Sequence, residues 1–463
     1  MRTSVRLSVV SVLAVAALTL PLTAAASVAE AVSTFTYSKN MHPLGYSPRV
    51  VPFTGAGSGS FNSDLAFWGD WAFQGTYDGF RVIDITKPQR PKEALFQSCN
   101  GNQGDVIVWG KSKNKPDLLV RSYNSPAAAG ATCDGQPIAE GFEGIHVFDL
   151  SNFGNPQLVA SVPTPCGSHT ATGVPDPANN RLIVYNQTSG GPCPFITILE
   201  VPLDNLAGTG IVGQAPLTDA GACHDSGVIL GKVNKMVCAS HSHANVFDIG
   251  ANEIPGGSLT SPQFLYTISE PGVGDGTLGS GNWHSAAWTW DGKVIILGWE
   301  PGGGSQPRCT ATGTMLPGGV TQTDTHKSYF FYSAKDGSKL GQFVLPRPQT
   351  VEENCTIHNY NVVPLKNKKK KARYVLVAGN YQAGISVVDF TNPAAAKEIA
   401  YADPAPLVPT QLGGDWSTYW YNGRIYESDI TRGLMIWRLN DPAVATYFRT
   451  DHSNPQTQEF SID

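Results

Sequence analysis

The segment GISVVDFTNPAAAKEIAYA (residues 384–402) contains the pattern from which the fold can be inferred. It opens with glycine, continues through β-branched apolar residues to an aspartate, turns at an Asn-Pro pair and ends in a second short strand-like run. The segments GIHVFDLSNFGNPQLVASV (144–162) and GFRVIDITKPQRPKEALF (79–96) repeat this order, and weaker copies begin at Asn245 and Gly433. Short β-branched runs that are separated by Gly, Pro and Asn are typical of β-strands. Each copy therefore predicts two antiparallel strands.

A strand–turn–strand element precedes each copy, as in HSAAWTWDGKVIILG (284–298) and WSTYWYNGRIYES (416–428). The two elements together make a unit of four antiparallel strands, and no stretch has a helical period. Seven such units begin near Ser63, Asp105, His169, His224, His284, His358 and Trp416. Four-stranded units repeated around an axis form a β-propeller. We therefore predict an all-β fold, a seven-bladed β-propeller of four-stranded antiparallel blades over residues 63–450.

The N-terminal residues predict export. Arg2 and Arg6 precede an apolar run and then small residues, which is the pattern of a secretory signal peptide. We assign the signal peptide to residues 1–31, with cleavage after either Ala26 or Ala31. No later stretch has the ~18 consecutive apolar residues that a membrane span needs. We expect a secreted, monomeric protein without a membrane span.

Two further segments flank the predicted propeller. Residues 32–62 are a lead-in with few strand signals, and residues 451–463 are a polar tail. The outer strand that closes the ring could come from PRVVPF (48–53) or from VATYFRT (444–450), and the sequence does not choose between them.

The composition narrows the class of protein. Charged residues make up 15% of the chain, with 49 Gly and 33 Pro, which argues for many turns and against helix bundles or disorder. The formal net charge of −5 offers no basic surface for nucleic acid.

The chain has eight cysteines, an even number, which in an exported protein predicts disulfides. We expect neighbours in sequence to pair, because each bond would then lie within or between adjacent repeats: Cys99–Cys133, Cys166–Cys193, Cys223–Cys238 and Cys309–Cys355. The alternative is that Cys223 and Cys238 are thiolate ligands of a metal, although no CxxC motif of the usual structural zinc site is present.

The segments at Gly79, Gly144 and Gly384 share the pattern G-[IFL]-x-V-[IVF]-D-[ILF]-[ST]. This pattern resembles the LVIVD repeat of secreted bacterial proteins, clearly in three units and partly in the others. The resemblance implies a β-propeller and an exported location. It implies little about activity, because one fold serves many functions.

Four histidines occupy equivalent positions in the predicted units. His169, His224, His284 and His358 each begin the innermost strand of consecutive units. Inner strands line the central channel, so their first residues should surround one of its mouths. Imidazole is the commonest side chain that binds Cu, Fe or Zn near neutral pH. The four histidines are therefore candidate metal ligands.

Other polar residues should lie at the same mouth. The loop between the second and third strands of the fourth unit carries His241 and His243, which together with Asp225 are the candidate catalytic groups for proton transfer. Asp105, Asp225 and Asp415 are candidate supporting partners of the histidines. The competing interpretation is structural, because repeats often keep a histidine that hydrogen-bonds only to backbone.

Two functions follow from these patterns. The first is an extracellular module that binds an unidentified ligand or protein through the histidine-rich mouth. The alternative is a metal-dependent (Cu, Fe or Zn) oxidoreductase or hydrolase with a four-histidine centre, and the sequence leaves open whether the protein is an enzyme. A third hypothesis, an envelope scaffold, needs no site at all.

Overall fold

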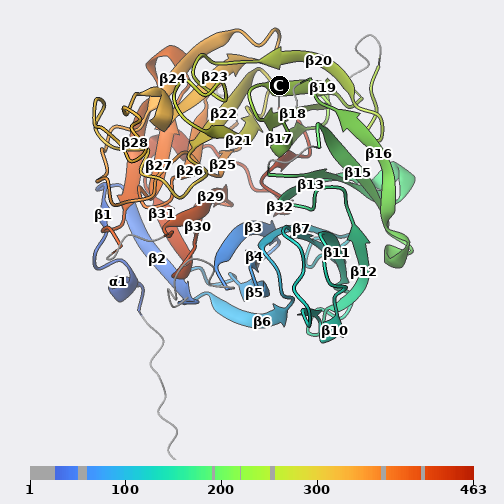
Figure 1. Cartoon of the computed structure of the whole chain (residues 1–463). Helices are drawn as coiled ribbons and strands as arrows, with labels where there is room; N and C mark the ends of the chain where they lie inside the picture. Colours follow the sequence, from blue (N-terminus) through green and yellow to red (C-terminus); the bar gives the residue numbers. More distant parts are fainter. Residues whose placement is uncertain are drawn as a thin grey trace, which may run out of the picture.

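The computed structural model describes residues 27–50, 60–189, 193–218, 221–250, 256–366, 372–407 and 412–462, so the predicted signal peptide lies almost wholly outside the described residues. Seven antiparallel sheets surround a common axis, and the fold is a seven-bladed β-propeller, as predicted (Figure 1). Helix is confined to α1 (Val28–Ala31) and five 3-10 turns among the described residues, namely Pro177–Asn179, Leu206–Gly208, Thr325–Lys327, Pro393–Ala395 and Pro442–Val444.

Each blade uses four strands in the order of the chain, with one exception at the closing blade. The first three blades comprise β3 (Asn62–Trp68), β4 (Trp71–Thr76), β5 (Gly79–Asp84) and β6 (Lys92–Ser98); β7 (Gln103–Trp109), β8 (Leu118–Tyr123), β11 (Gly144–Asp149) and β12 (Gln157–Pro163); and β13 (Thr170–Asp176), β14 (Arg181–Gln187), β15 (Phe195–Pro202) and β16 (Gly210–Pro216). The short hairpin of β9 (Thr132–Cys133) and β10 (Gln136–Pro137) extends the second blade's loop.

The next three blades follow the same order. They comprise β17 (Cys223–Ile229), β18 (Lys235–Ser240), β19 (Ala244–Asp248) and β20 (Gln263–Ile268); β21 (Gly281–Trp288), β22 (Val294–Pro301), β23 (Ser328–Ser333) and β24 (Lys339–Val344); and β25 (Tyr360–Val362), β26 (Val375–Gly379), β27 (Ile385–Asp389) and β28 (Lys397–Asp403), to which β1 (Thr36–Tyr37) adds an edge.

The closing blade joins the two ends of the chain. Its inner strands are β29 (Asp415–Tyr421), β30 (Arg424–Asp429) and β31 (Gly433–Leu439), and its outer strand is β2 (Met41–Pro48) from the lead-in. The ring is therefore closed from the N-terminal side, by a strand that ends where the PRVVPF segment begins. The alternative segment 444–450 forms no strand.

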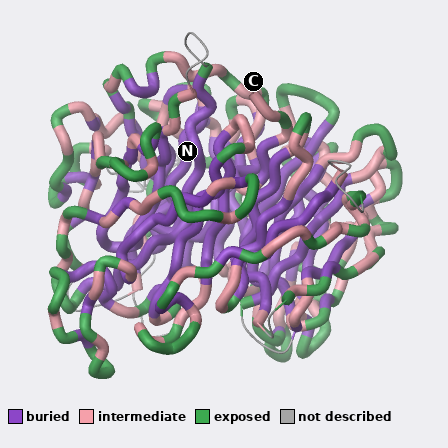
Figure 2. The backbone as a smooth tube through the Cα atoms, turned by 90° about the horizontal axis from the view of Figure 1, so that it is seen from above, coloured by how far each residue is buried: buried purple, intermediate pink, exposed green. Residues whose placement is uncertain are grey.

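The first strands of the blades line the axis. Each packs on the first strand of the next blade, and β29 packs on β3, which completes the circle. The strands nearest the axis are almost wholly buried, whereas exposed residues lie in the connecting loops and outer strands (Figure 2). The apolar core lies between neighbouring blades, so all seven depend on the closure.

The polar C-terminal segment enters the channel instead of trailing into solvent. β32 (His452–Ser453) pairs with the end of β3, and β33 (Thr457–Gln458) pairs with the end of β17. Both contacts are at the C-terminal ends of the inner strands. The tail therefore closes the channel at the mouth opposite to the starts of those strands.

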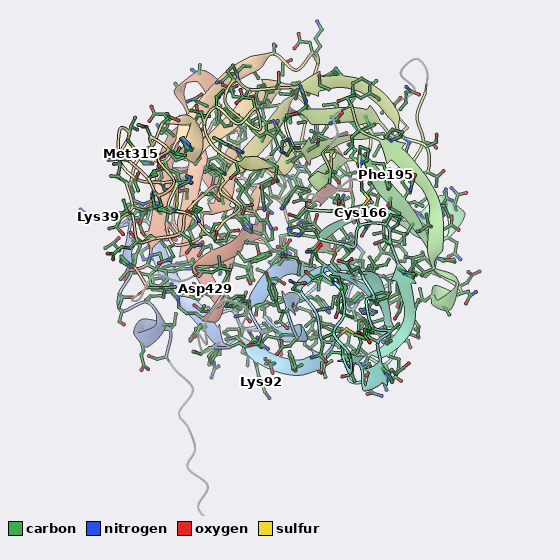
Figure 3. All side chains as sticks on the ribbon, in the orientation of Figure 1. Lys39, Lys92, Cys166, Phe195, Met315 and Asp429 are labelled. Carbon is green, nitrogen blue, oxygen red and sulfur yellow. A yellow bond between two sulfur atoms is a disulfide. The ribbon has the colours of Figure 1, made fainter. Side chains whose placement is uncertain are left out.

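The four expected cysteine pairs are disulfide-bonded: Cys99–Cys133, Cys166–Cys193, Cys223–Cys238 and Cys309–Cys355. Cys166 is labelled in Figure 3. The thiolate-ligand alternative for Cys223 and Cys238 is therefore wrong in this oxidised state. Four disulfides indicate an oxidising environment. None of the helices in the described part of the chain has the length and hydrophobicity that crossing a bilayer requires.

Candidate metal centre

The four predicted histidines form a continuous arc at one mouth of the channel. The ring centroids of His169 and His224 are 4.4 Å apart, those of His224 and His284 4.0 Å, and those of His284 and His358 4.3 Å. All four side chains are buried, and the most exposed, His169, reaches only 9%. Imidazoles that are up to 189 residues apart in the chain thus meet because each begins an equivalent blade.

Local irregularities in the inner strands help to place these rings. The pairing of β17 with β18 skips a residue at His224, and the pairing of β21 with β22 skips one at His284. A β-bulge of this kind turns a side chain out of the regular alternation of a strand. The bulges are consistent with the two imidazoles turning toward the mouth.

Hydrogen bonds fix the tautomers of two histidines. Ser285 Oγ donates to the carbonyl of His358 (2.6 Å), so it accepts from Nδ1–H of His284 at 2.9 Å. Nδ1 of His358 bonds to the backbone carbonyl of Trp416, which can only accept. In both rings the proton is therefore on Nδ1, and the lone pair that can bind a metal is on Nε2.

Both of these lone pairs face one carboxylate that the sequence analysis did not identify. Nε2 of His284 and Nε2 of His358 each lie 3.8 Å from Oε1 of Glu300, which is 6% exposed and sits at the end of β22. His224, His284 and Glu300 each offer a ligand atom within 4.8 Å of the others. Glu300 could have been found, because the end of a second strand opens on the same mouth as the start of a first strand.

Tyr381 holds the carboxylate in place. Its hydroxyl donates to Oε1 of Glu300 at 2.7 Å, and its ring lies 4.3 Å from that of His358. The loop after β22 covers this pair, since a Cβ at Gly304 would lie 2.2 Å from the Tyr381 hydroxyl and 2.6 Å from Oε1 of Glu300. Only glycine permits this close approach, and its φ of +73° also favours glycine.

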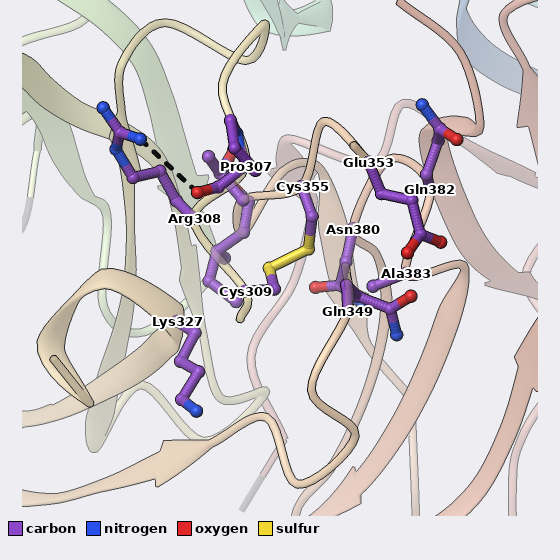
Figure 4. Close-up of a disulfide and its surroundings, with 12 residues drawn as sticks. Pro307, Arg308, Cys309, Lys327, Gln349, Glu353, Cys355, Asn380, Gln382 and Ala383 are labelled. Carbon is purple, nitrogen blue, oxygen red and sulfur yellow. Dashed lines mark hydrogen bonds between the residues drawn. A yellow bond between two sulfur atoms is a disulfide. The ribbon is translucent and has the colours of Figure 1, made fainter. Parts of the chain in front are cut away.

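A disulfide fixes the covering loop to the segment that carries His358. Cys309, within the loop, is bonded to Cys355, three residues before His358, as Figure 4 shows. The backbone N–H of Gln349 also donates to the Cys309 carbonyl. The loop over the candidate centre is thus anchored covalently at its base.

Burial sets the charge states of the site. It lowers the pKa of His224 to about 4 and that of His358 to about 3, and it holds the pKa values of His169 and His284 well below the ordinary range. Burial also raises the pKa of Glu300 to about 7, partly offset by the Tyr381 hydrogen bond. The imidazoles are therefore neutral, as metal ligands must be.

Two ring nitrogens at the site are unsatisfied. Nδ1 of His169 and Nδ1 of His224 are buried and have no hydrogen-bond partner among the described residues. A buried polar atom without a partner costs about 1–3 kcal/mol. A purely structural role for these histidines leaves that cost unexplained, whereas a bound ligand or metal would account for it.

The candidate catalytic residues adjoin the arc in the chain and in space, since Asp225 follows His224 and the His241 carbonyl accepts from the backbone N–H of Trp283, next to His284, at 3.4 Å. His241 is exposed and His243 is half-buried, both in the turn between β18 and β19, with Nδ1 of His243 2.8 Å from the Ser242 hydroxyl. Asp225 is buried in the channel, where its carboxylate accepts from the backbone N–H of Ser226. The side chains of His241 and His243 are thus more exposed than those of the four buried histidines and Glu300.

The aspartates proposed to support the histidines are engaged elsewhere. Asp105 accepts hydrogen bonds from the backbone N–H groups of Val106 and Ala171. Asp415 accepts from the hydroxyl of Thr418 at 2.9 Å. The groups that orient the imidazoles are instead Ser285 and a backbone carbonyl.

No protein-family model matches the chain, and no curated protein sequence matches it. Solved structures that are similar include the computationally designed Ika8 protein (11% identity over 86% of this chain and 99% of that chain, TM-score 0.44). BamB from Moraxella catarrhalis has 12% identity over 87% of this chain and 97% of that chain, with a TM-score of 0.42. A chain of a mitotic checkpoint complex has 9% identity over 87% of this chain and 94% of that chain, with a TM-score of 0.49. Similarity at these sequence identities and TM-scores gives no information about the function of this chain.

Proposed function

We propose that this chain is an exported, LVIVD-like β-propeller metalloprotein whose centre at the histidine mouth binds one first-row transition metal. The ligands are Nε2 of His284 and His358, Oε1 of Glu300 and a ring nitrogen of His224, with His169 adjacent. The observation that carries the proposal is the convergence of two tautomer-fixed lone pairs on one carboxylate oxygen, each at 3.8 Å.

The donor set limits the metal and its chemistry. Imidazole nitrogens with one carboxylate oxygen suit Zn, Fe or Cu better than hard cations such as Ca²⁺. The two Nε2–Oε1 distances of 3.8 Å are slightly wider than a tetrahedral site with metal–nitrogen bonds near ~2.1 Å requires. His358 is outside the group of His224, His284 and Glu300 whose ligand atoms all lie within 4.8 Å of one another, so the donors would have to move inward to complete the coordination.

The ligands occupy only one side of the mouth. The histidines come from the third to sixth blades, whereas the closing blade places Trp416 at this level. A catalytic metal keeps a coordination position open for substrate. With four protein donors, the metal would have to expand to five-coordination to bind a substrate, and the side of the mouth without histidines is where that substrate would reach it. On this basis the proposed activity is that of a metal-dependent oxidoreductase or hydrolase.

The simpler hypothesis, a module that binds an extracellular ligand or protein through this mouth, receives less support. The propeller fold is compatible with it. However, the four histidines are at most 9% exposed, so they offer little surface to a macromolecule.

Elemental analysis of the mature protein, purified without an affinity tag, tests the proposal. We expect near-stoichiometric Zn, Fe or Cu that is lost in a His224→Ala/His284→Ala double variant and kept in His42→Ala, which alters a half-buried histidine on β2. Metal-free protein that gains no thermal stability from added Zn²⁺, Fe²⁺ or Cu²⁺ would refute it, because a ligand that binds the native state must stabilise it.

A further inference from the structure

A second group of acidic side chains is enclosed in the closing blade. Asp415 begins β29, and Glu427 and Asp429 lie on the neighbouring strand β30, where Asp429 is directly opposite Asp415. All three are 0% exposed, and each offers a carboxylate oxygen within 4.8 Å of the others. Asp429 is labelled in Figure 3. The backbone of Asp415 pairs with that of Tyr381, so the acidic cluster adjoins the histidine mouth, but its carboxylates are not among the ligands of the proposed metal centre.

Each of the three carboxylates accepts hydrogen bonds at one of its two oxygens. Oδ2 of Asp415 accepts from Thr418, Oε2 of Glu427 accepts from the indole N–H of Trp437 at 2.6 Å, and Oδ1 of Asp429 accepts from backbone N–H groups that include that of Arg432. These bonds fix the orientation of the carboxylates.

Two of the remaining oxygens have no donor from outside the cluster. Oδ1 of Asp415 and Oε1 of Glu427 are buried and accept from no other group among the described residues, and the two carboxyl groups hydrogen-bond only to each other, which requires a proton on one of them when no cation is bound. Oδ2 of Asp429 faces the Nε of Arg432 at 3.0 Å. Buried carboxylate oxygens without a partner require an explanation, which is either a cation or a proton.

The charge balance of the cluster matches a divalent cation. With all three carboxyl groups ionised, the cluster would carry three negative charges, of which Arg432 neutralises one. The two charges that are left equal those of one divalent ion. An all-oxygen donor set that combines several carboxylates selects a hard cation, and Ca²⁺ tolerates irregular oxygen geometry better than Mg²⁺ does.

The position of the cluster gives such an ion a structural role. The carbonyl of Arg432 accepts from the Tyr46 hydroxyl at 2.8 Å and from the Arg49 backbone N–H at 2.9 Å. Tyr46 belongs to β2, the strand from the N-terminal side that closes the ring. The acidic cluster therefore lies where the two ends of the propeller are joined.

We infer that Asp415, Glu427 and Asp429 bind one Ca²⁺ ion that stabilises the closing blade and its junction with β2. The ion would take the place of the proton between Asp415 and Glu427 and balance the two remaining charges.

Thermal unfolding of the full mature protein in excess Ca²⁺ and in excess chelator tests this inference, together with calcium analysis after dialysis. We expect about one bound Ca²⁺ per chain and a midpoint several degrees higher with Ca²⁺. Glu427→Gln keeps the size of the side chain and should abolish the Ca²⁺-dependent difference. Asp415→Asn provides a second variant if the first does not fold.

Glu300→Gln is the matched control, since it removes a buried carboxylate at the histidine mouth and should keep the full Ca²⁺ response. This control also separates the two proposals, because the loss of transition metal in Glu300→Gln is independent of calcium. The inference is overturned if Ca²⁺ leaves the midpoint of the wild type unchanged. It is also overturned if Glu427→Gln and Asp415→Asn respond to Ca²⁺ as the wild type does. The wild type could instead be insensitive to Ca²⁺ while its unfolding midpoint rises relative to that of Glu427→Gln as the pH falls. That result would show that protons, and not a cation, occupy the site.

Discussion

At the scale of single residues, the histidine mouth is organised by hydrogen bonds on the far side of each ring. Ser285 and the Trp416 carbonyl engage Nδ1 of His284 and His358, which directs both Nε2 atoms toward Glu300. Partners of this kind set the tautomer and the direction of a ligand and are part of most metal sites. This arrangement, more than the number of histidines, distinguishes the mouth from an ordinary histidine-containing turn.

Glu300 is the residue whose replacement should be most informative. Glu300→Gln removes the anionic donor but keeps its shape, so we expect transition-metal affinity to fall by more than the roughly 10–100-fold that the loss of a supporting contact costs. Competition titration with a metal chelator measures this change. Glu353→Gln, another buried glutamate, which accepts from the backbone and hydroxyl of Thr350, should leave the affinity unchanged. Equal affinity in wild type and Glu300→Gln would exclude Glu300 as a ligand.

His146, a buried residue on β11 of the second blade, should make stability depend on pH. Burial, and then the charge of Arg121, lower its pKa from 6.5 to about 3. Because the unfolded chain takes up a proton near pH 6.5 and the native state does not, stability falls as the pH drops from about 6.5 toward 3. Between pH 6.5 and about 4.5 this one group should cost about 2–3 kcal/mol. Denaturant unfolding at both pH values should show that His146→Leu loses less free energy of unfolding than the wild type, by that amount. Identical pH profiles of the two proteins would contradict the lowered pKa of His146.

At the scale of elements, the C-terminal tail is the least expected part of the structure. It is polar in sequence, yet Asn454, Thr457 and Gln458 are at most 7% exposed. Their side chains bond to the backbone of three inner strands, at Val108, Gly173 and Trp288. The tail thus satisfies backbone groups at the channel mouth and links the second, third and fifth blades.

Asn454 provides the test of this link. Its amide donates to the Val108 carbonyl at 2.8 Å and accepts from the Val108 N–H at 2.9 Å. Asn454→Ala leaves both backbone groups without that partner, so we expect a loss of about 2–3 kcal/mol in the free energy of unfolding. Chemical denaturation measures this loss, and Asn155→Ala in an exposed turn should change stability little. A neutral Asn454→Ala would mean that water replaces the tail at no cost.

At the scale of the whole molecule, stability depends on closing the circle. β2 completes the last blade against β31, and its buried Met41 belongs to the same apolar cluster as Trp437. Without β2, the edge of β31 would be exposed, and open strand edges promote aggregation. Ring closure therefore couples the N-terminal segment to every blade.

A chain that begins at Arg49 should reveal this coupling. We expect it to lose several kcal/mol of the roughly 5–15 kcal/mol typical of a domain and to self-associate. Size-exclusion chromatography and denaturant unfolding detect both effects. A chain that begins at Val32 lacks α1 but keeps β1 and β2, and it should remain monomeric with stability near that of a chain that begins at Ser27. Monomeric, cooperative unfolding of the chain from Arg49 would show that the closure is dispensable.

The sequence by itself determined the repeat, the number of blades and the arc of His169, His224, His284 and His358, whereas the cysteine pairing that it led us to expect was decided by the structure. These features follow from period and alternation, which are local properties that each repeat carries in its own residues. Only the tertiary structure decided which segment closes the ring, where the polar tail lies, and that Glu300 and Tyr381 join the arc while the side chains of His241 and His243 are more exposed. The tail and β2 gave weak strand signals, because their pairing depends on edges that exist only once the blades have formed. Glu300 and Tyr381 lie on different blades and outside the repeated position, so their meeting at 2.7 Å depends on the curvature of the closed ring.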